Sequence, residues 1–157
     1  METIKISNVS VNKKRRIIWI MTAALFIIGT AYVAMNYSRY GNKKTSIKIK
    51  DQTIRVEIVT SQKKMTQGLS GRDGICDQCG MLFLFDKKGS YRIWMKDMKF
   101  DLDIIWIEGD SIVSIKRNIS SSYPDIMRSE SVADKVLEVP SGFCDKHEIH
   151  VGDGMEL

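Results

Sequence analysis

Apolar and polar residues alternate with a period of two along much of the chain after residue 46, which is typical of strands with one buried face. The alternation is clearest in residues 47–50 and 54–58, which together predict a hairpin around Asp51 and Gln52. Residues 81–85 are apolar throughout, which favours a strand buried on both faces. The same reasoning predicts further strands at residues 91–95, 103–107, 112–115, 136–139 and 155–157.

Two segments between the predicted strands have the pattern of short helices. They are residues 61–67, with Ser61 as the N-cap, and residues 141–147. Many short strands separated by turn residues predict a mainly β fold of the α+β class. We therefore expect a compact, barrel-like β domain with one or two short helices.

A different pattern occupies residues 17–38, a 22-residue run without a charged side chain. At about 1.5 Å per residue, a helix of this length reaches about 33 Å and crosses a hydrocarbon core of about 30 Å. The run predicts one transmembrane helix in contact with membrane lipid. A signal peptide is the alternative, but its apolar core has only about 7–15 residues. Cleavage needs small residues at the last and third-last positions, and a cut after Ala34 would put Tyr32 in the second of these.

The charges that flank this run predict its orientation. Four consecutive cations, Lys13 to Arg16, precede the run and favour a cytoplasmic N-terminus, while Arg39, Lys43 and Lys44 follow it at lower density. We expect a single-pass protein of the cell membrane with its C-terminal domain outside. Its predicted parts are a cytoplasmic basic tail (1–16), the transmembrane helix (17–38), a linker (39–46) and a β-rich extracytoplasmic domain (47–157).

The net charge of +5 belongs to the membrane flanks. Residues 1–44 hold eight of the 24 Lys and Arg residues but one of the 19 acidic residues, so the remainder of the chain is slightly acidic. The basic flanks favour anionic lipid headgroups. A slightly acidic domain gives no support to nucleic-acid binding, and we expect none.

Separated motifs follow one another in a characteristic order through the predicted β domain. They are Gly68-Leu69 with Arg72, residues 80–85, residues 94–96, residues 102–107, residues 136–139 with Gly142, and Gly152-Asp153. In this order they resemble the bacterial and archaeal family called domain of unknown function 192. The resemblance implies a compact β-rich domain, often exported or membrane-tethered, and no established activity. The sequence departs from the family at Asp101, where a proline is usual, and at Cys76 and Cys79, in a loop that commonly lacks cysteine.

A Cys-x-x-Cys pair followed by glycine is the sharpest local motif. Cys76 and Cys79 have the spacing of a zinc knuckle, and Cys144 and His147 repeat that spacing near the C-terminus. These four side chains would complete a tetrahedral zinc site if the fold joins the two loops. The alternatives are a Cys76–Cys79 disulfide or free thiols, because thiols outside the cytoplasm tend to oxidise, with Cys144 unpaired or bonded to another chain.

Two carboxylates lie inside predicted apolar strands, where an unpaired charge is costly to bury. They are Asp103 and Glu138, and Arg72 and Lys96 are their candidate partners. They form either a polar pocket that recognises a ligand or a set of outward-facing side chains and structural ion pairs. Trp94, with polar neighbours at the end of its segment, is the aromatic residue that best suits a ligand groove rather than the core.

These observations support three hypotheses about function. The first is a binding module for an envelope saccharide or peptide, with a groove near Arg72, Trp94, Lys96, Asp103 and Glu138. The second is a hydrolase in which Asp103 and Glu138 share an open cleft, about 5–9.5 Å apart. The third is a structural or assembly protein with the membrane helix and Cys144 as contact points.

Overall fold

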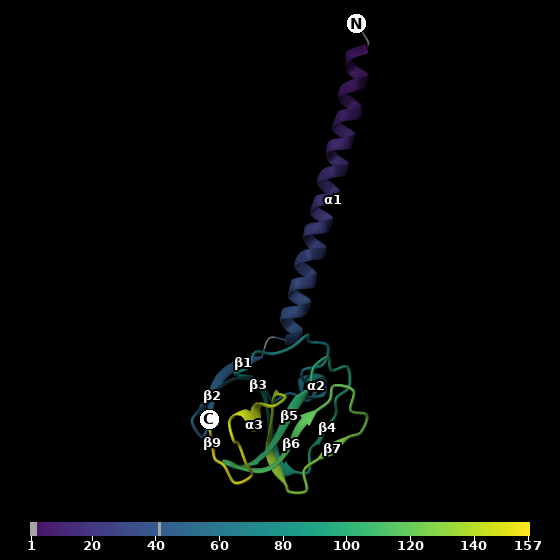
Figure 1. The fold of residues 1–157 in the computed structure, drawn as a ribbon. Coiled ribbons are helices and arrows are strands. Elements are labelled where there is room, and N and C mark those ends of the chain that lie inside the picture. The colour runs from purple at the N-terminus through teal and green to yellow at the C-terminus, as the bar shows by residue number, and fades with distance from the viewer. Residues whose placement is uncertain (1–2, 41) are drawn as a thin grey trace. The chain divides into compact units, whose positions relative to one another are not determined.

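The computed structural model describes residues 3–40 and 42–157, and the side chains of residues 13–35 and 42–157. Helix α1 (Thr3–Tyr40) and the domain from Asn42 onward form two separate compact units (Figure 1). Within α1, residues Lys13–Met35 have a mean hydropathy of 2.1, and none of that segment is buried. The helix thus begins well before the predicted span of residues 17–38 and has the length and composition to cross a membrane.

The domain begins with the predicted hairpin, but the hairpin starts earlier than expected. Strand β1 (Lys43–Ile49) pairs antiparallel with β2 (Gln52–Val59), and Lys43 lies opposite Ile58. The predicted linker is therefore wrong over residues 43–46, because these residues are paired in β1. Residue 41 lies outside the described residues. The polar run 43–46 has no apolar alternation, so its pairing follows from the neighbouring strand rather than from its own pattern.

The central strands complete a seven-stranded sheet in the order β6-β5-β8-β3-β2-β1-β9. The β2–β3 pair is parallel, and the other named pairs of this sheet are antiparallel. The connection from β2 to β3 carries helix α2 (Gln62–Gln67), whose N-cap residue Ser61 makes no side-chain capping bond. The remaining strands of this sheet are β3 (Cys79–Gly89), β5 (Leu102–Glu108), β6 (Ser111–Ile119), β8 (Ala133–Pro140) and β9 (Met155–Glu156).

The sheet curls so that its two edges approach each other through the segment around β9. Met155 pairs with Ile49 on one edge, while Gly154 bridges to Ser111 on the other. The Ile112 amide also donates to the carbonyl of Asp153 at 2.9 Å. The result is the barrel-like β domain that the sequence predicts, and the mainly β fold class is confirmed.

Both faces of the sheet are buried, and each faces its own apolar core. One face, here called the α3 face, is covered by helix α3 (Phe143–Lys146) and the residues that follow it, and its core includes Leu82, Ile105, Leu137, Val139, Phe143 and Ile149. The other, the α2 face, is covered by α2, its following loop and a two-stranded sheet of β4 (Arg92–Ile93) and β7 (Met127–Arg128). Its core includes Leu69, Met81, Phe83, Ile93, Met95, Trp106 and Val136.

One glycine is required where β3 and β8 lie close together. A Cβ atom on Gly80 would sit 2.8 Å from the carbonyl oxygen of Glu138, which is too short for a carbon–oxygen contact. The glycine that follows the Cys-x-x-Cys pair therefore serves the packing of the sheet beside Glu138. The strand predicted at residues 91–95 is shorter than expected, because only Arg92 and Ile93 pair with β7.

Candidate functional site

The two buried carboxylates lie on neighbouring strands but point to opposite faces of the sheet. Asp103 on β5 is aligned with Val139 on β8, and Ile104 is aligned with Glu138. Successive residues of a strand point to opposite faces. Asp103 therefore faces the α3 side with Val139, and Glu138 faces the α2 side. The predicted hydrolase is corrected on this point, since its two carboxylates would need to share one cleft.

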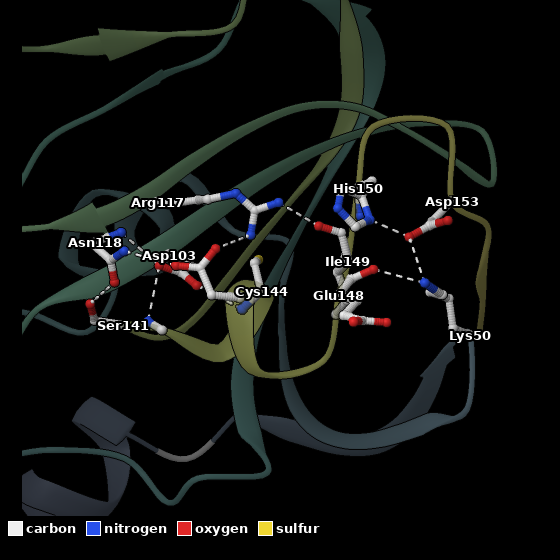
Figure 2. Close-up of polar contacts among 12 residues, drawn as sticks. Lys50, Asp103, Arg117, Asn118, Ser141, Cys144, Glu148, Ile149, His150 and Asp153 are labelled. Atoms are coloured by element: carbon white, nitrogen blue, oxygen red, sulfur yellow. Dashed lines mark hydrogen bonds and ion pairs between the residues drawn. The ribbon is translucent and has the colours of Figure 1, made fainter.

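Asp103 is fully buried and holds the start of α3 against β6 (Figure 2). Its Oδ2 accepts the amide N–H of Cys144 at 2.8 Å, and its Oδ1 accepts that of Asn118 at 2.7 Å. A third amide, from Gly142, reaches Oδ1 at 3.3 Å. Three backbone donors compensate for the loss of water around this carboxylate, which makes Asp103 a structural residue.

A polar network around Asp103 ties α3 to β6. Arg117 forms an ion pair with Asp145 at 2.8 Å and donates to the carbonyl of Ile149. Asn118 also donates to Asp145, at 3.1 Å, and accepts a hydrogen bond from the Ser141 hydroxyl at 2.8 Å. Figure 2 shows Arg117, Asn118 and Ser141 around Asp103. Because these side chains bond to one another, we assign them a role in stabilising the fold.

The Cys144 thiol lies beside Asp103 and has no exposed surface. Burial, together with the nearby Asp103 carboxylate, raises the pKa of this thiol to about 12. A thiol that stays protonated and buried is a poor nucleophile and a poor metal ligand. The prediction that Cys144 is a contact point for assembly is therefore corrected, because another chain cannot reach it in this fold.

A cavity of about 410 Å³ opens on the α2 face. We call it the Glu138 pocket. It lies between α2 with its following loop, β3 and the segment that contains β4, and it is within the size range of small-ligand sites. Its lining residues are Gln62, Met65, Thr66, Gln67, Gly68, Leu69, Ser70, Phe83, Phe85, Ser90, Tyr91, Arg92, Ile93, Trp94, Met98 and Glu138.

Glu138 lies in this pocket with 6% of its surface exposed. Burial raises the pKa of its carboxyl to about 8, although the positive charge of Arg72 opposes part of the rise. The side chain is therefore mostly neutral at pH 7 and presents both an O–H donor and a C=O acceptor. Its Oε2 atom has no hydrogen-bond partner among the side chains described, those of residues 13–35 and 42–157, in contrast to the oxygens of Asp103.

Arg72 is held beside Glu138 by a second acid that the sequence did not suggest. Its guanidinium makes two bonds of 2.8 Å to Glu57 on β2. Pairing across the sheet places Glu57 next to Met81, and Met81 next to Glu138, so all three face the α2 side. Burial opposes ionisation of Glu57, but the hydrogen bonds from Arg72 and Asn42 outweigh it and lower the pKa of Glu57. Glu57 thus neutralises the charge of Arg72, and Glu138 has no ion-pair partner of its own among the side chains that the structure describes.

Gln67 gives the pocket a second unmatched polar group. Its Nε2 atom is buried and has no hydrogen-bond partner within the described part of the chain. Gln67 ends α2, and Gly68 directly follows it with a φ of +50°. A Cβ atom at Gly68 would lie 3.9 Å from Glu138 Oε2, which places the Glu138 oxygen close to the end of α2. No sequence signal marks Gln67, because a glutamine at a helix end is ordinary.

Aromatic side chains form much of the remaining wall. Phe85 and Tyr91 stack with ring centroids 3.5 Å apart, and both line the pocket. Trp94 lines it as well and is 44% exposed. A pocket lined by both polar and aromatic side chains suits a ligand that has both apolar faces and hydrogen-bonding groups.

The structure thus divides the five predicted ligand residues. Trp94 and Glu138 line one pocket, and Arg72 acts on Glu138 through its charge. Lys96 has an exposed side chain, and its backbone carbonyl accepts a hydrogen bond from Ser70. Asp103 lies on the opposite face of the sheet.

The structure joins Cys76 and Cys79 in a disulfide. It also brings their turn next to α3, because Gln78 Nε2 lies 3.4 Å from His147 Nε2. The disulfide sulfurs are not thiolates, and among the side chains of residues 13–35 and 42–157 no three His, Cys, Asp or Glu form a group that could hold a metal ion. The structure therefore matches the disulfide alternative, and zinc binding by the reduced chain stays a prediction.

Comparison with known proteins identifies a family but no activity. A model of the family described as "Uncharacterized ACR" (DUF192) matches residues 45–157. A search of curated proteins finds no match.

Two solved structures have the same fold. One, from Sinorhizobium meliloti 1021, is described as a "putative transcription regulator". It is similar with 25% sequence identity and a TM-score of 0.71, over 73% of this chain and 94% of that one. The other is a protein of unknown function from Novosphingobium aromaticivorans DSM 12444, with 23% identity and a TM-score of 0.72, over 75% of this chain and 88% of that one.

Proposed function

From its place in the DUF192 family, to which this chain belongs, we propose that the protein is a membrane-anchored binding module that takes a small neutral ligand in the Glu138 pocket. The family is uncharacterised, so its fold supplies no activity, and the proposal must rest on the site. The ligand we propose is a saccharide of the cell envelope.

The observation that carries the proposal is a pair of buried polar atoms without partners in one cavity. Glu138 and Gln67 come from different elements and line the same pocket, and neither Glu138 Oε2 nor Gln67 Nε2 has a hydrogen-bond partner among the described residues. Each such atom costs about 1–3 kcal/mol when it is left unsatisfied. A ligand that bonds to both would recover this cost, which favours a binding site over a surface hollow.

The charges around the pocket favour a neutral ligand. Glu138 is mostly protonated at pH 7, and Glu57 neutralises Arg72. An ammonium ligand would gain little from a neutral carboxyl and would lie near the guanidinium of Arg72. A saccharide suits both parts of the site, since it offers hydroxyl groups to Glu138 and Gln67 and an apolar face to Trp94.

The anchoring part of the proposal rests on helix α1. Its segment Lys13–Met35 is long and apolar enough to cross a membrane, and the cations at residues 13–16 favour a cytoplasmic N-terminus. The Cys76–Cys79 disulfide supports an oxidising compartment for the domain.

Nuclear magnetic resonance of the tryptophan indoles tests ligand binding. The full chain, in detergent micelles with ¹⁵N-labelled tryptophan, is titrated with cellotriose and with triacetylchitotriose. We expect a saturable shift of the Trp94 indole with at least one of them, and its loss in Glu138→Leu. Glu156→Gln, an exposed acid on β9, is the matched control and should bind as the unmodified chain does. The absence of any saturable shift with both saccharides would overturn the proposed function.

Labelling of introduced cysteines tests the topology. Ser46→Cys places an exposed thiol on β1, and Asn12→Cys places one before the apolar segment. A membrane-impermeant maleimide applied to spheroplasts should label Ser46→Cys directly and Asn12→Cys only after lysis. Cys144 is buried and the other two cysteines are bonded, so the background is low. The reverse labelling pattern would overturn the proposed orientation.

A further inference from the structure

We propose that the Glu138 pocket recognises the acetamido group of an N-acetylated sugar, through paired hydrogen bonds with Glu138 and Gln67. The inference rests on the proposed function, because it names the chemical class of the ligand of the same site. Its starting point is the polar atoms of Glu138 and Gln67 that have no hydrogen-bond partner among the described residues.

Glu138 and Gln67, which both line the pocket, together offer hydrogen-bond donors and an acceptor. A neutral carboxyl at Glu138 offers an O–H and a C=O, and the Gln67 amide nitrogen offers N–H donors alone. Burial raises the pKa of Glu138 to about 8, so the neutral form is present at pH 7. Glu138 Oε2 lies close to Gly68, the residue after Gln67, and both Glu138 and Gln67 line the pocket.

An acetamido group complements this arrangement in one contact. Its carbonyl oxygen has two lone pairs and can accept from both Glu138 and Gln67, while its N–H can donate to the other oxygen of the Glu138 carboxyl. A single hydroxyl group has one proton to donate and cannot reproduce the flat, paired geometry of an amide with a carboxylic acid. A carboxylate ligand offers no donor to the carboxyl.

The walls suit the rest of such a ligand. The ring of Phe83 comes within 3.6 Å of the Cβ position at Gly68 and so forms an apolar surface beside the Glu138 oxygen. This surface fits the methyl group of the acetamide. The partly exposed Trp94 and the stacked pair Phe85–Tyr91 provide aromatic faces for a sugar ring.

The test compares probes that differ in the acetamido group. Affinities of the full chain in detergent micelles are measured for triacetylchitotriose, cellotriose and N-acetylalaninamide. We expect triacetylchitotriose to bind at least about tenfold more tightly than cellotriose, as for one well-formed extra interaction. Equal affinity for these two saccharides would overturn the inference and leave the proposed function standing. No binding of either saccharide would overturn both.

N-acetylalaninamide tests whether the site recognises the amide of an acetylated sugar or that of a peptide. This probe has the amide without a sugar ring, and we expect it to bind at least about tenfold more weakly than triacetylchitotriose. If it bound as tightly as the saccharide, the site would be one for peptide amides, and the assignment to a sugar would be overturned.

A variant of Gln67 tests the role of that residue. Gln67→Leu should lower the affinity for triacetylchitotriose about tenfold more than it lowers the affinity for cellotriose, so the preference between the two disappears. Gln52→Leu, a partly buried position in β2, is the matched control and should keep the preference. Retention of the preference in Gln67→Leu would contradict the paired contact.

Discussion

Asp103 and Glu138 are buried carboxylates on paired strands, yet their surroundings differ in almost every respect. Asp103 has no exposed surface, and its oxygens accept three backbone amides. Glu138 is 6% exposed, and its Oε2 has no partner among the described residues. The alignment of β5 with β8 places Asp103 on the α3 face and Glu138 on the α2 face. The same chemical group is thus part of the framework on one side and of a cavity on the other.

The difference shows that hydrogen-bond partners, rather than burial, distinguish a structural acid from a candidate binding residue. Both carboxyls lose their water on folding, which is unfavourable without compensation. For Asp103 the backbone amides of Cys144, Asn118 and Gly142 supply this compensation by donating hydrogen bonds. For Glu138 nothing in the described residues does so at Oε2, and the raised pKa is the result. Burial alone would have grouped the two residues together.

The largest expected effect is on the Asp103 side of this comparison. Asp103→Asn removes the charge and puts a donor where backbone amides also donate, so we expect the free energy of unfolding to fall by about 3–5 kcal/mol. Asp101→Asn is the control, because Asp101 accepts one exposed amide, that of Ser121, and should cost about 1 kcal/mol. Denaturant unfolding of the full chain in detergent measures both. A loss of less than 1 kcal/mol in Asp103→Asn would contradict the structural role.

A smaller effect, opposite in sign, is expected on the Glu138 side. In the unfolded chain Glu138 ionises near 4.5, and in the folded domain near 8. Between these values the folded state holds the proton that the unfolded state has lost, so stability falls as the pH rises. Glu138→Gln cannot ionise, and we expect it to raise the free energy of unfolding at pH 7 by about 2–3 kcal/mol.

The pH dependence distinguishes this effect from ordinary repacking. The gain in Glu138→Gln should shrink toward zero as the pH falls to 4.5 and should level off above pH 8. Unfolding curves collected across this range, with Glu156→Gln as an exposed control, test the sign and the window. A gain that is constant with pH would show that Glu138 is not held neutral by the fold.

The smallest effect concerns the thiol beside Asp103. Cys144→Ala removes one buried sulfur but leaves the backbone amide that Asp103 accepts, so we expect a loss of about 1 kcal/mol. In the unmodified chain the thiol, with a pKa near 12, should resist iodoacetamide at pH 8, while cysteines 76 and 79 should react after reduction. Mass spectrometry of the alkylated chain reports both, and rapid labelling of Cys144 would contradict its burial.

Much of the domain could be predicted from local pattern, because each strand shows it within a few residues. The alternation at residues 54–58 and the apolar run at 81–85 correspond to β2 and β3, and the fold class follows. The early start of β1 could not be predicted. Its first four residues are Lys, Lys, Thr and Ser, and they pair because β2 presents an unpaired edge to them.

The candidate site was harder to predict, since it depends on register between distant segments. Residues 102–107 are all buried, so β5 offers no alternation from which to tell the face of Asp103. The opposite orientation of Glu138 emerges only from the alignment of β5 with β8. Glu57 was missed because a polar residue in an alternating strand is normally assigned to solvent, whereas this sheet is covered on both faces.

The segment around β9 has a consequence for the order in which the domain folds. Its bonds to Ile49 on one edge and to Ser111 and Ile112 on the other are the ties that bring the two ends of the sheet together. A ribosome completes this segment only after all the other strands have been made. Until then β1 and β6 remain exposed edges that can pair with other chains. The nascent domain is therefore most prone to aggregation just before its closing segment is synthesised.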